Sequence, residues 1–425
     1  MRAGVVDRLL ARLDGAVAPI WVTLLVELDA PPDVAELRRA VRALVAETPR
    51  LRVAWLEPQG RWLEVPRSDA QIEAVVEVTP APMPFAEAVR RALSTGVDLG
   101  GDVPLRMRLG PVTGGAAPWL LALQLHHALG DARAFGLLLE RLFSHMHGEA
   151  RGPGLGAPAL TEQRALAEIA RRLPLLVGAA RPRRSLLARR GMSLGRDGAD
   201  IGAQTVRTLR APFGERQLPP GVSPSDVFFA SMLAAVVATE VGADDDARVR
   251  LRVPVDLRQA LGAPATLETP CSALAVEVPL GEARARLADP AALAALVRAR
   301  VAEEMRAGVP WATLLEYLTL CRVVSRRSLR AGARPGLLDD PRAATLVLTH
   351  VGDLDRYFRR CPFAIRGMRG HTPTWGATSF TFRGVLSVNI AAFEGLWGER
   401  RHRAFAAEAA TWMRQHLGIA AEVEG

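Results

Sequence analysis

Segments with the pattern of strands alternate with segments with the pattern of helices along this chain of 425 residues, and this alternation restricts the fold most. Short β-branched and apolar runs are typical of strands, whereas apolar residues spaced three and four apart are typical of amphipathic helices. Two mixed halves of similar size predict an α/β (α+β) protein with two lobes. The predicted strands are 20–28, 51–56, 61–65, 72–78, 105–109, 119–125, 248–255, 274–278, 345–349, 377–383 and 385–391, and the predicted helices are 34–47, 84–95, 133–146, 223–241, 290–307, 311–325 and 399–417.

An arginine-rich segment joins the two halves. Residues 164–196 contain nine arginines and one acid, Glu168, so this segment carries +8 of the formal net charge of +9. We therefore predict a first lobe over residues 1–163, a crossover over 164–202 and a second lobe over 203–425. The crossover is either a solvated linker or a surface that attracts an anionic membrane or an acidic or phosphorylated partner.

Residue types that are absent or sparse exclude several classes of function. All 54 basic residues are arginine, which excludes a Schiff-base lysine, a P-loop NTPase and a protein kinase. The three cysteines are too scattered for a disulfide framework or a zinc site, so we expect no metal and a reducing compartment. Nucleic-acid binding is disfavoured because residues 164–196 contain no aromatic side chain for base stacking.

The location of the protein follows from its apolar segments. The N-terminus has no signal-peptide pattern, and the longest apolar stretch, residues 227–239, is too short to cross a bilayer. We therefore expect a cytoplasmic protein, with peripheral membrane contact through residues 164–196 as the alternative.

The stretch LALQLHHALGDARAF at residues 121–135 contains the candidate catalytic residues. An apolar strand ends in His126 and His127, and Asp131 follows three residues later, before a helix. Histidine is the side chain best suited to proton transfer near neutral pH, and a strand end holds it rigidly. The residues alone leave a second interpretation open, in which the two histidines complete a strand and Asp131 only caps the next helix.

His126, His127 and Asp131 resemble the HHxxxDG motif of the condensation-domain and chloramphenicol acetyltransferase-like superfamily. That superfamily includes nonribosomal peptide condensation domains, wax ester synthase/diacylglycerol acyltransferases and polyketide-associated acyltransferases. The resemblance spans nearly the whole chain, because further stretches match in the family's order: residues 48–52 (TPRLR), 104–106 (PLR), 223–227 (SPSDV), 254–258 (PVDLR) and 349–352 (THVG).

The resemblance implies a pseudo-dimer of two chloramphenicol acetyltransferase-like lobes with a tunnel between them. By this analogy His127 is the general base, and His126 supports the structure of the loop. Asp131 orients the loop through an ion pair with Arg258, since arginine suits a bidentate pair.

Four further residues are assigned to the substrate site, on motifs that are less specific than the histidine motif. Ser379 and Thr381 lie on one face of a predicted strand that would face the tunnel, unless they are ordinary polar strand residues. Trp375 would form part of the tunnel wall, and His350 occupies the place of an asparagine in the family's pattern. The motif's final glycine is Ala132 here, and we expect the neighbouring Gly130 to supply the flexibility of the turn.

The function implied is that of a stand-alone acyltransferase. It would move an acyl group from a coenzyme A or carrier-protein thioester to a hydroxyl acceptor, with the acyl-CoA or acyl-phosphopantetheine as donor substrate and no other cofactor. The sequence ends without a carrier domain, so an acyl carrier protein would be a separate partner. Two alternatives remain: an amide-forming condensation enzyme of natural-product biosynthesis, and a non-catalytic relative that binds a carrier protein or lipid.

Overall fold

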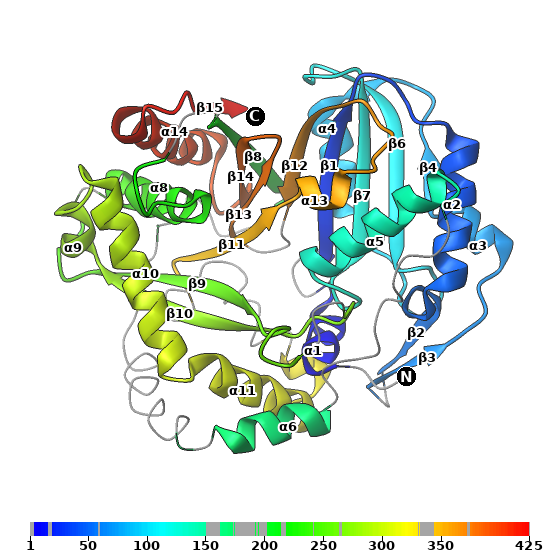
Figure 1. Ribbon diagram of the computed structural model, residues 1–425, viewed down its shortest axis with the longest axis horizontal. Helices are drawn as coiled ribbons and strands as arrows, with labels where there is room; N and C mark the ends of the chain where they lie inside the picture. Colours follow the sequence, from blue (N-terminus) through cyan, green and yellow to red (C-terminus); the bar gives the residue numbers. More distant parts are fainter. Residues whose placement is uncertain are drawn as a thin grey trace.

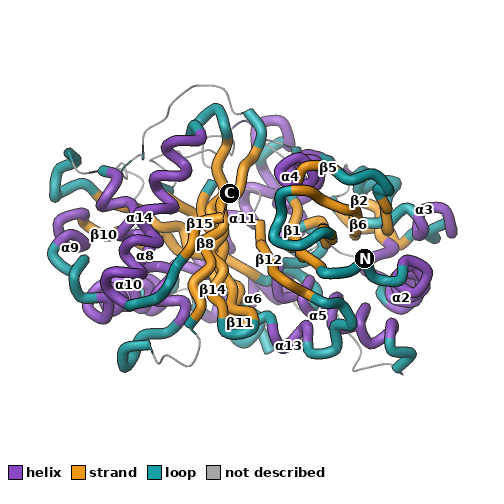
Figure 2. Tube along the Cα trace, turned by 90° about the horizontal axis from the view of Figure 1, so that it is seen from above, coloured by secondary structure: helices purple, strands orange, loops and turns teal. Residues whose placement is uncertain are grey.

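The computed structural model has two lobes that lie side by side, each built around one sheet (Figures 1 and 2). It describes residues 4–15, 19–57, 60–149, 162–172, 174, 192, 194, 202–213, 218–240, 242–262, 266–329, 331, 344–371 and 375–424. Within these residues, no helix is both long enough and apolar enough to cross a bilayer.

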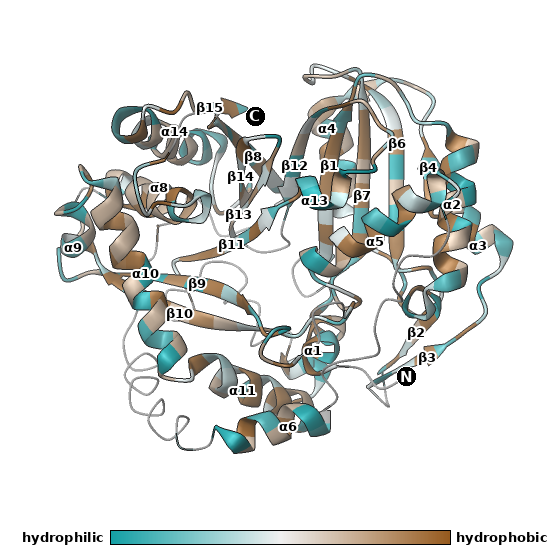
Figure 3. Ribbon diagram, in the orientation of Figure 1, coloured by the Kyte–Doolittle hydropathy of each residue, from teal (hydrophilic) through white to brown (hydrophobic). Residues whose placement is uncertain are grey.

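The first lobe contains a sheet with the strand order β12-β1-β7-β6-β4, to which β5 adds beside β6. The helices α2 and α5 cover one face, where their leucines join the core of β1 and β7, and α4 covers the other. The apolar strands of this sheet stand out in Figure 3. Its elements are β1 (Trp21–Leu28), α2 (Val34–Glu47), the short helix Pro49–Arg52, β2 (Val53–Leu56), β3 (Arg61–Glu64), α3 (Asp69–Glu73), β4 (Val76–Val78), β5 (Met83–Pro84), α4 (Phe85–Ser94), β6 (Leu105–Thr113), β7 (Trp119–His126) and α5 (Ala132–Met146).

The second lobe contains a sheet with the strand order β10-β9-β11-β13-β14-β8-β15. The helices α8, α10 and α14 contribute to its core. The helix α8 is apolar on all sides and is accordingly almost completely buried. The elements are β8 (Gln204–Pro212), α8 (Pro224–Thr239), β9 (Arg248–Asp256), β10 (Cys271–Pro279), α9 (Leu280–Arg284), α10 (Pro290–Arg306), β11 (Leu346–Asp353), α13 (Asp355–Phe358), β13 (Gly376–Phe382), β14 (Val385–Phe393), α14 (Glu399–Leu417) and β15 (Glu422–Glu424).

One strand from the second half of the chain belongs to the first sheet. The strand β12 (Ile365–His371) pairs antiparallel with β1, and it is drawn in orange beside the blue β1 in Figure 1. The main chain of the second half therefore completes the sheet that carries His126.

A third apolar cluster connects the N-terminus to the second half. The helix α1 (Val5–Leu13) packs against α6 (Glu162–Arg171) and α11 (Val309–Val323), and its Val5 and Val6 are buried there with Trp311. The N-terminal helix is thus anchored on helices that lie more than 150 residues further along the chain.

The mixed α/β, two-lobed fold predicted from the alternation of segments is confirmed. The strand predicted at residues 72–78 begins only at Val76, because Ser68 and Gln71 form a capping box that starts a short helix before it. The boundaries predicted at residues 163 and 203 stay a prediction, and most of the crossover 164–202 lies outside the described residues.

Candidate active site

The loop between β7 and α5 carries the three motif residues. His126 is the last residue of β7, and Asp131 is the N-cap of α5, where its Oδ1 accepts a hydrogen bond of 2.9 Å from the N–H of Ala134. Gly130, which we expected to supply the flexibility of the turn, does not adopt a left-handed conformation. It is needed for space instead, since a Cβ there would lie 2.8 Å from the Cβ of Ala134 and 3.1 Å from the carbonyl oxygen of Leu267 in the other lobe.

His127 is half-buried directly after the strand end, with its N–H bonded to the carbonyl of Ile20 at 2.9 Å. Burial lowers the pKa of its imidazole, although the residue's own carbonyl and the nearby Asp131 act in the opposite direction. Nδ1 is buried, and neither Nδ1 nor Nε2 forms a hydrogen bond with the described part of the chain. The ring is therefore neutral near pH 7, and Nε2 is the nitrogen available to accept a proton.

His126 is fully buried and faces the first lobe. Its Nδ1 accepts a hydrogen bond of 3.2 Å from the N–H of Ala128, which leaves the proton of the neutral ring on Nε2. That Nε2 lies 3.3 Å from Oδ1 of Asp14, and the ring packs edge-on against Trp21. These contacts fix the shape of the loop.

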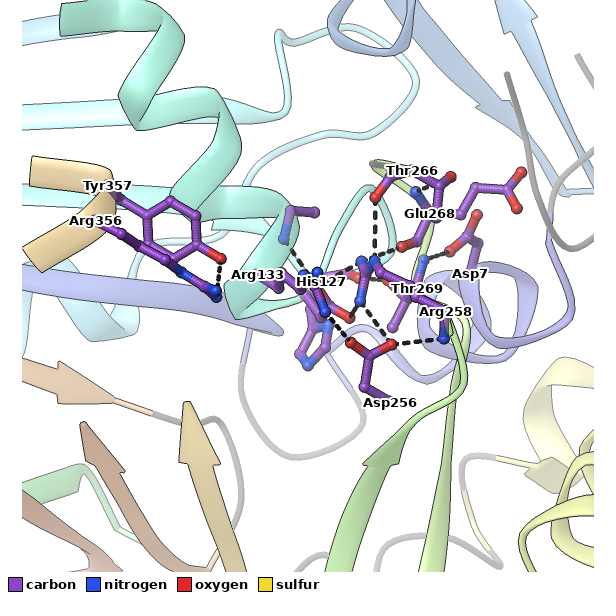
Figure 4. A network of polar contacts seen from close by, with 12 residues as sticks. Asp7, His127, Arg133, Asp256, Arg258, Thr266, Glu268, Thr269, Arg356 and Tyr357 are labelled. Atoms are coloured by element: carbon purple, nitrogen blue, oxygen red, sulfur yellow. Dashed lines mark hydrogen bonds and ion pairs between the residues drawn. The ribbon is translucent and has the colours of Figure 1, made fainter. Parts of the chain in front are cut away.

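Arg258, just after the end of β9, reaches across from the second lobe to Asp131. Figure 4 shows Arg258 with Asp256 and Thr266 close by. Its Nη1 and Nη2 donate to the two oxygens of Asp131 at 2.7 and 2.9 Å, and the side chain of Arg258 has no exposed surface. Its remaining N–H groups donate to Asp256 and to the carbonyls of Thr266 and Glu268. Burial lowers the pKa of Arg258, but the carboxylates of Asp131 and Asp256 together outweigh it and leave that pKa above the ordinary value.

A second ion pair across the two lobes was not anticipated from the sequence. Nη1 of Arg133, on α5, donates to Oδ2 of Asp256 at 3.0 Å, and both side chains are about one-third exposed. Asp256 therefore links Arg133 and Arg258. The sequence offered no signal for this pair, because 123 residues separate its members.

The carbonyls of the loop are held by residues to which we had assigned no role. Arg50, in the matched TPRLR stretch, donates from Nε to the carbonyl of Leu129 at 2.6 Å and from Nη2 to the carbonyl of Ala128 at 3.5 Å. The hydroxyl of Thr269 donates to the carbonyl of His127 at 3.3 Å. Three successive carbonyls of the loop are thus hydrogen-bonded to side chains.

Asp7 of α1 connects Arg50 with Thr269, the two residues that hold the loop carbonyls. Its Oδ2 accepts a hydrogen bond from Nη2 of Arg50, and its Oδ1 accepts one of 3.3 Å from the N–H of Thr269. Asp7 and Arg50 are both buried, so the pair is shielded from water. One carboxylate near the N-terminus therefore couples the two lobes beneath the His127 loop.

The predicted substrate residues fall into three environments. Ser379 is fully buried, and its Oγ lies 2.8 Å from Nδ1 of His350, whose pKa is lowered by burial. Thr381 is half-buried further along β13. Trp375, assigned to the tunnel wall, lies in the core of the second lobe, where it contacts Trp397 and its Nε1 donates to the carbonyl of Thr345 at 3.1 Å. No hydrogen bond between described residues joins this group to the His127 loop.

A cavity of about 640 Å³ lies between the two lobes. Leu25, Phe85 and Arg369 line it from the first sheet and α4, and residues of β8, α14 and β15 line the other side. Beside it, the buried carboxylate of Glu27 accepts hydrogen bonds of 3.0 Å from Arg369 and 2.9 Å from Arg210 of the second lobe. His127 is not among the lining residues, and the tunnel implied by the resemblance stays a prediction.

The described arginines of the predicted crossover are bound within the protein. Arg171 and Arg172 pair with Glu168, and Arg172 also lies over the ring of Trp311 at 4.1 Å. Arg164 donates to the carbonyl of Leu261. The other arginines of this segment lie outside the described residues, and the structure gives the membrane contact no support. Among the described side chains, no cluster of three or more His, Cys, Asp or Glu could hold a metal ion.

Comparisons with known proteins relate this geometry to two groups of proteins. No protein-family model matches the chain. A segment of 134 residues, 31% of the chain, is 31% identical to CymA, a probable nonribosomal peptide synthetase of Salinispora arenicola, and covers 2% of that protein's length.

Solved structures match over nearly the entire chain. The TRI3 trichothecene 15-O-acetyltransferase from Fusarium sporotrichioides has a TM-score of 0.67 at 11% identity, covering 98% of this chain and 94% of that one. TRI101 of F. graminearum, solved with coenzyme A and T-2 mycotoxin, has a TM-score of 0.63 at 13% identity, covering 100% and 99%. The first condensation domain of the calcium-dependent antibiotic synthetase has a TM-score of 0.64 at 18% identity, covering 98% of both chains. The same fold thus occurs in acetyltransferases and in condensation domains.

Proposed function

We propose that this chain, which has the fold of the condensation-domain and chloramphenicol acetyltransferase-like superfamily, is an acyltransferase that forms an ester from an acyl thioester and a hydroxyl acceptor. The proposal rests on the protonation and the surroundings of His127. Its ring is neutral, its Nε2 has no partner among the described residues, and the carbonyls of its loop are held from both lobes. A fixed and unprotonated imidazole is what a general base requires.

In the proposed step, Nε2 of His127 takes the proton of the acceptor hydroxyl as its oxygen attacks the thioester carbonyl carbon. The new C–O bond forms, the C–S bond breaks, and the proton passes from His127 to the departing sulfur. The donor is an acyl-CoA or an acyl-phosphopantetheine on a carrier protein, which agrees with the coenzyme A in the TRI101 structure. The step needs no other cofactor.

Direct transfer is favoured over an acyl-enzyme. Cys271 is a cysteine near the loop, and burial together with the charge of Asp131 raises the pKa of its thiol. A thiol kept protonated is a poor nucleophile. Asp131, Arg258, Asp7 and Arg50 act as positioning residues, because their contacts are with the loop and with one another.

An amide product is the second candidate. The similarity to a peptide synthetase over 134 residues supports it, because a condensation enzyme would use the same base on an amine acceptor. The identity of the acceptor decides between the two candidates.

The test is acyl transfer from acetyl-CoA and octanoyl-CoA to a panel of simple alcohols and amines, with the products identified by mass spectrometry. We expect an acylated product that His127→Ala reduces by about a thousandfold or more, with an unchanged melting temperature. Acylated alcohols support the ester, and acylated amines support the alternative. Product formation that survives His127→Ala overturns the general-base proposal, and the absence of any product from the wild-type chain favours a non-catalytic binding protein.

A further inference from the structure

A row of polar side chains crosses three strands of the first sheet, β12, β1 and β7, which lie side by side in Figure 1. Thr23 of β1 lies directly opposite His371 of β12 and Gln124 of β7. Directly opposite residues project from the same face of a sheet, so these three side chains share one face.

This row lies between the cavity and the catalytic loop. Two residues along β1 in one direction, Leu25 is paired with Arg369, and both line the cavity. Two residues in the other direction, Trp21 is paired with His126. Because side chains alternate along a strand, the Leu25–Arg369 pair, the polar row and the Trp21–His126 pair are on the same face of the sheet. Neighbouring sets lie about 7 Å apart along the strand. The polar row is therefore one step from the cavity and one step from His126.

Polar atoms of this row are buried without partners among the described residues. His371 is 5% exposed, and neither Nδ1 nor Nε2 has a hydrogen-bond partner in that part of the chain. The amide nitrogen of Gln124 donates to Thr23 at 3.3 Å and to the carbonyl of Ala92 at 3.0 Å, but its buried Oε1 accepts none. Buried polar groups in folded proteins nearly always have partners, so unpaired groups in one row indicate a place that a ligand or water completes.

The row also indicates the type of group that it would bind. Burial lowers the pKa of His371 to about 3, so its ring is neutral and offers one N–H donor and one nitrogen acceptor. Gln124 offers a carbonyl acceptor. Arg106 of β6 lies directly opposite Gln124 and is half-buried, and its Nη1 donates to the carbonyl of Gly96 at 2.9 Å. The two side chains with unpaired atoms, His371 and Gln124, are both uncharged and suit a hydroxyl or amide group.

We propose that His371 and Gln124 hydrogen-bond an uncharged amide or hydroxyl group of a substrate that extends from the cavity toward the His127 loop. The proposal rests on the proposed acyl transfer, and it adds a recognition site to it. The bound group belongs either to the acyl donor or to the acceptor, and kinetics with each substrate varied in turn distinguishes the two sources.

The experiment compares His371→Phe, which keeps a planar ring without hydrogen-bonding atoms, with His371→Gln, which keeps a donor and an acceptor. His416→Phe, on α14 beside Trp412, is the matched control. We expect His371→Phe to raise KM about tenfold for one substrate, with kcat within about twofold and with resistance to urea kept or increased, because unpaired buried atoms are removed. We expect His371→Gln to recover at least part of the affinity.

A rise in the donor's KM assigns the bound group to the donor, and a rise in the acceptor's KM assigns it to the acceptor. If KM for both substrates is unchanged, or if the variant loses stability and kcat without a change in KM, the row is structural and the proposal is wrong. Gln124→Met provides the same readout should His371→Phe not fold. Failure of the proposed function is recognised separately, because the wild-type chain would then form no acyl product.

Discussion

The guanidinium of Arg258 and the carboxylate of Asp131 form two parallel hydrogen bonds, at 2.7 and 2.9 Å, across the junction of the two lobes. Asp131 caps the helix that follows His127, so the pair joins the His127 loop to the end of β9. The loop therefore depends on the second lobe for its position.

Asp131→Asn removes the charge of this pair but keeps an oxygen that can cap α5. We expect the free energy of unfolding in urea to fall by about 3 kcal/mol, because the buried Arg258 loses its main compensating charge. We expect kcat to fall by about tenfold to a hundredfold, because the loop loses its alignment. Arg133→Gln is the matched control, since it breaks an ion pair that is about one-third exposed at the same junction, and it should cost less than about 1 kcal/mol. Equal losses in the two variants would show that the buried pair has no special role.

Asp7 and Arg50 are expected to act on the rate rather than on binding. Asp7→Asn should lower kcat about tenfold and leave KM within about twofold, because it loosens the hold of Arg50 on the loop carbonyls. It should also lower the kinetic pKa of His127, since the Asp7 charge favours the protonated ring. A purely structural Asp7 would leave that pKa unchanged. Arg50→Lys should resemble Asp7→Asn, whereas Arg52→Lys, whose partner Glu64 is half-exposed, should have little effect.

The pH dependence of kcat/KM should follow from the burial of His127. Because burial lowers the pKa of the ring, the neutral form that accepts a proton persists below pH 6.5. We therefore expect kcat/KM to rise with pH through a midpoint below 6.5 and to be constant around pH 7. Arg133→Gln should show the same midpoint. A midpoint above 6.5 would contradict the assignment of His127 as a buried base.

The stability of the protein should decline as the pH falls below 6.5. The folded-state pKa values of His371 and His402 are about 3 and about 4, whereas the unfolded side chains titrate near 6.5. Between these pH values the unfolded chain binds protons that the folded chain does not bind. For each of the two histidines, the free energy of unfolding therefore falls by about 1.4 kcal/mol per pH unit as the pH is lowered. We expect His371→Phe to reduce the slope of unfolding free energy between pH 6 and pH 5 by that amount, and to leave the slope around pH 8 unchanged. An unaltered slope between pH 6 and pH 5 would contradict the burial of a neutral His371.

Much of the fold and the place of the catalytic loop could be predicted from the sequence because they depend on local patterns. The apolar run that forms β7, the histidine pair at its end and the capping carboxylate of Asp131 lie within one short stretch of chain. The capping box of Ser223 and Asp226 likewise fixes the start of α8. Periodicity and caps act between residues that are close in the chain, so they are visible without a structure.

What surrounds the loop was decided by the tertiary structure. The pairing of Asp7 with Arg50, and its hydrogen bond to Thr269, join residues 43 and 262 positions apart. With 54 arginines in the chain, composition cannot say which of them meets a given carboxylate. The same holds for Trp375, which the fold buries in the core of the second lobe, and for His371, which β12 carries into the first sheet. Local patterns determined where a base could stand, and long-range packing determined which side chains position it.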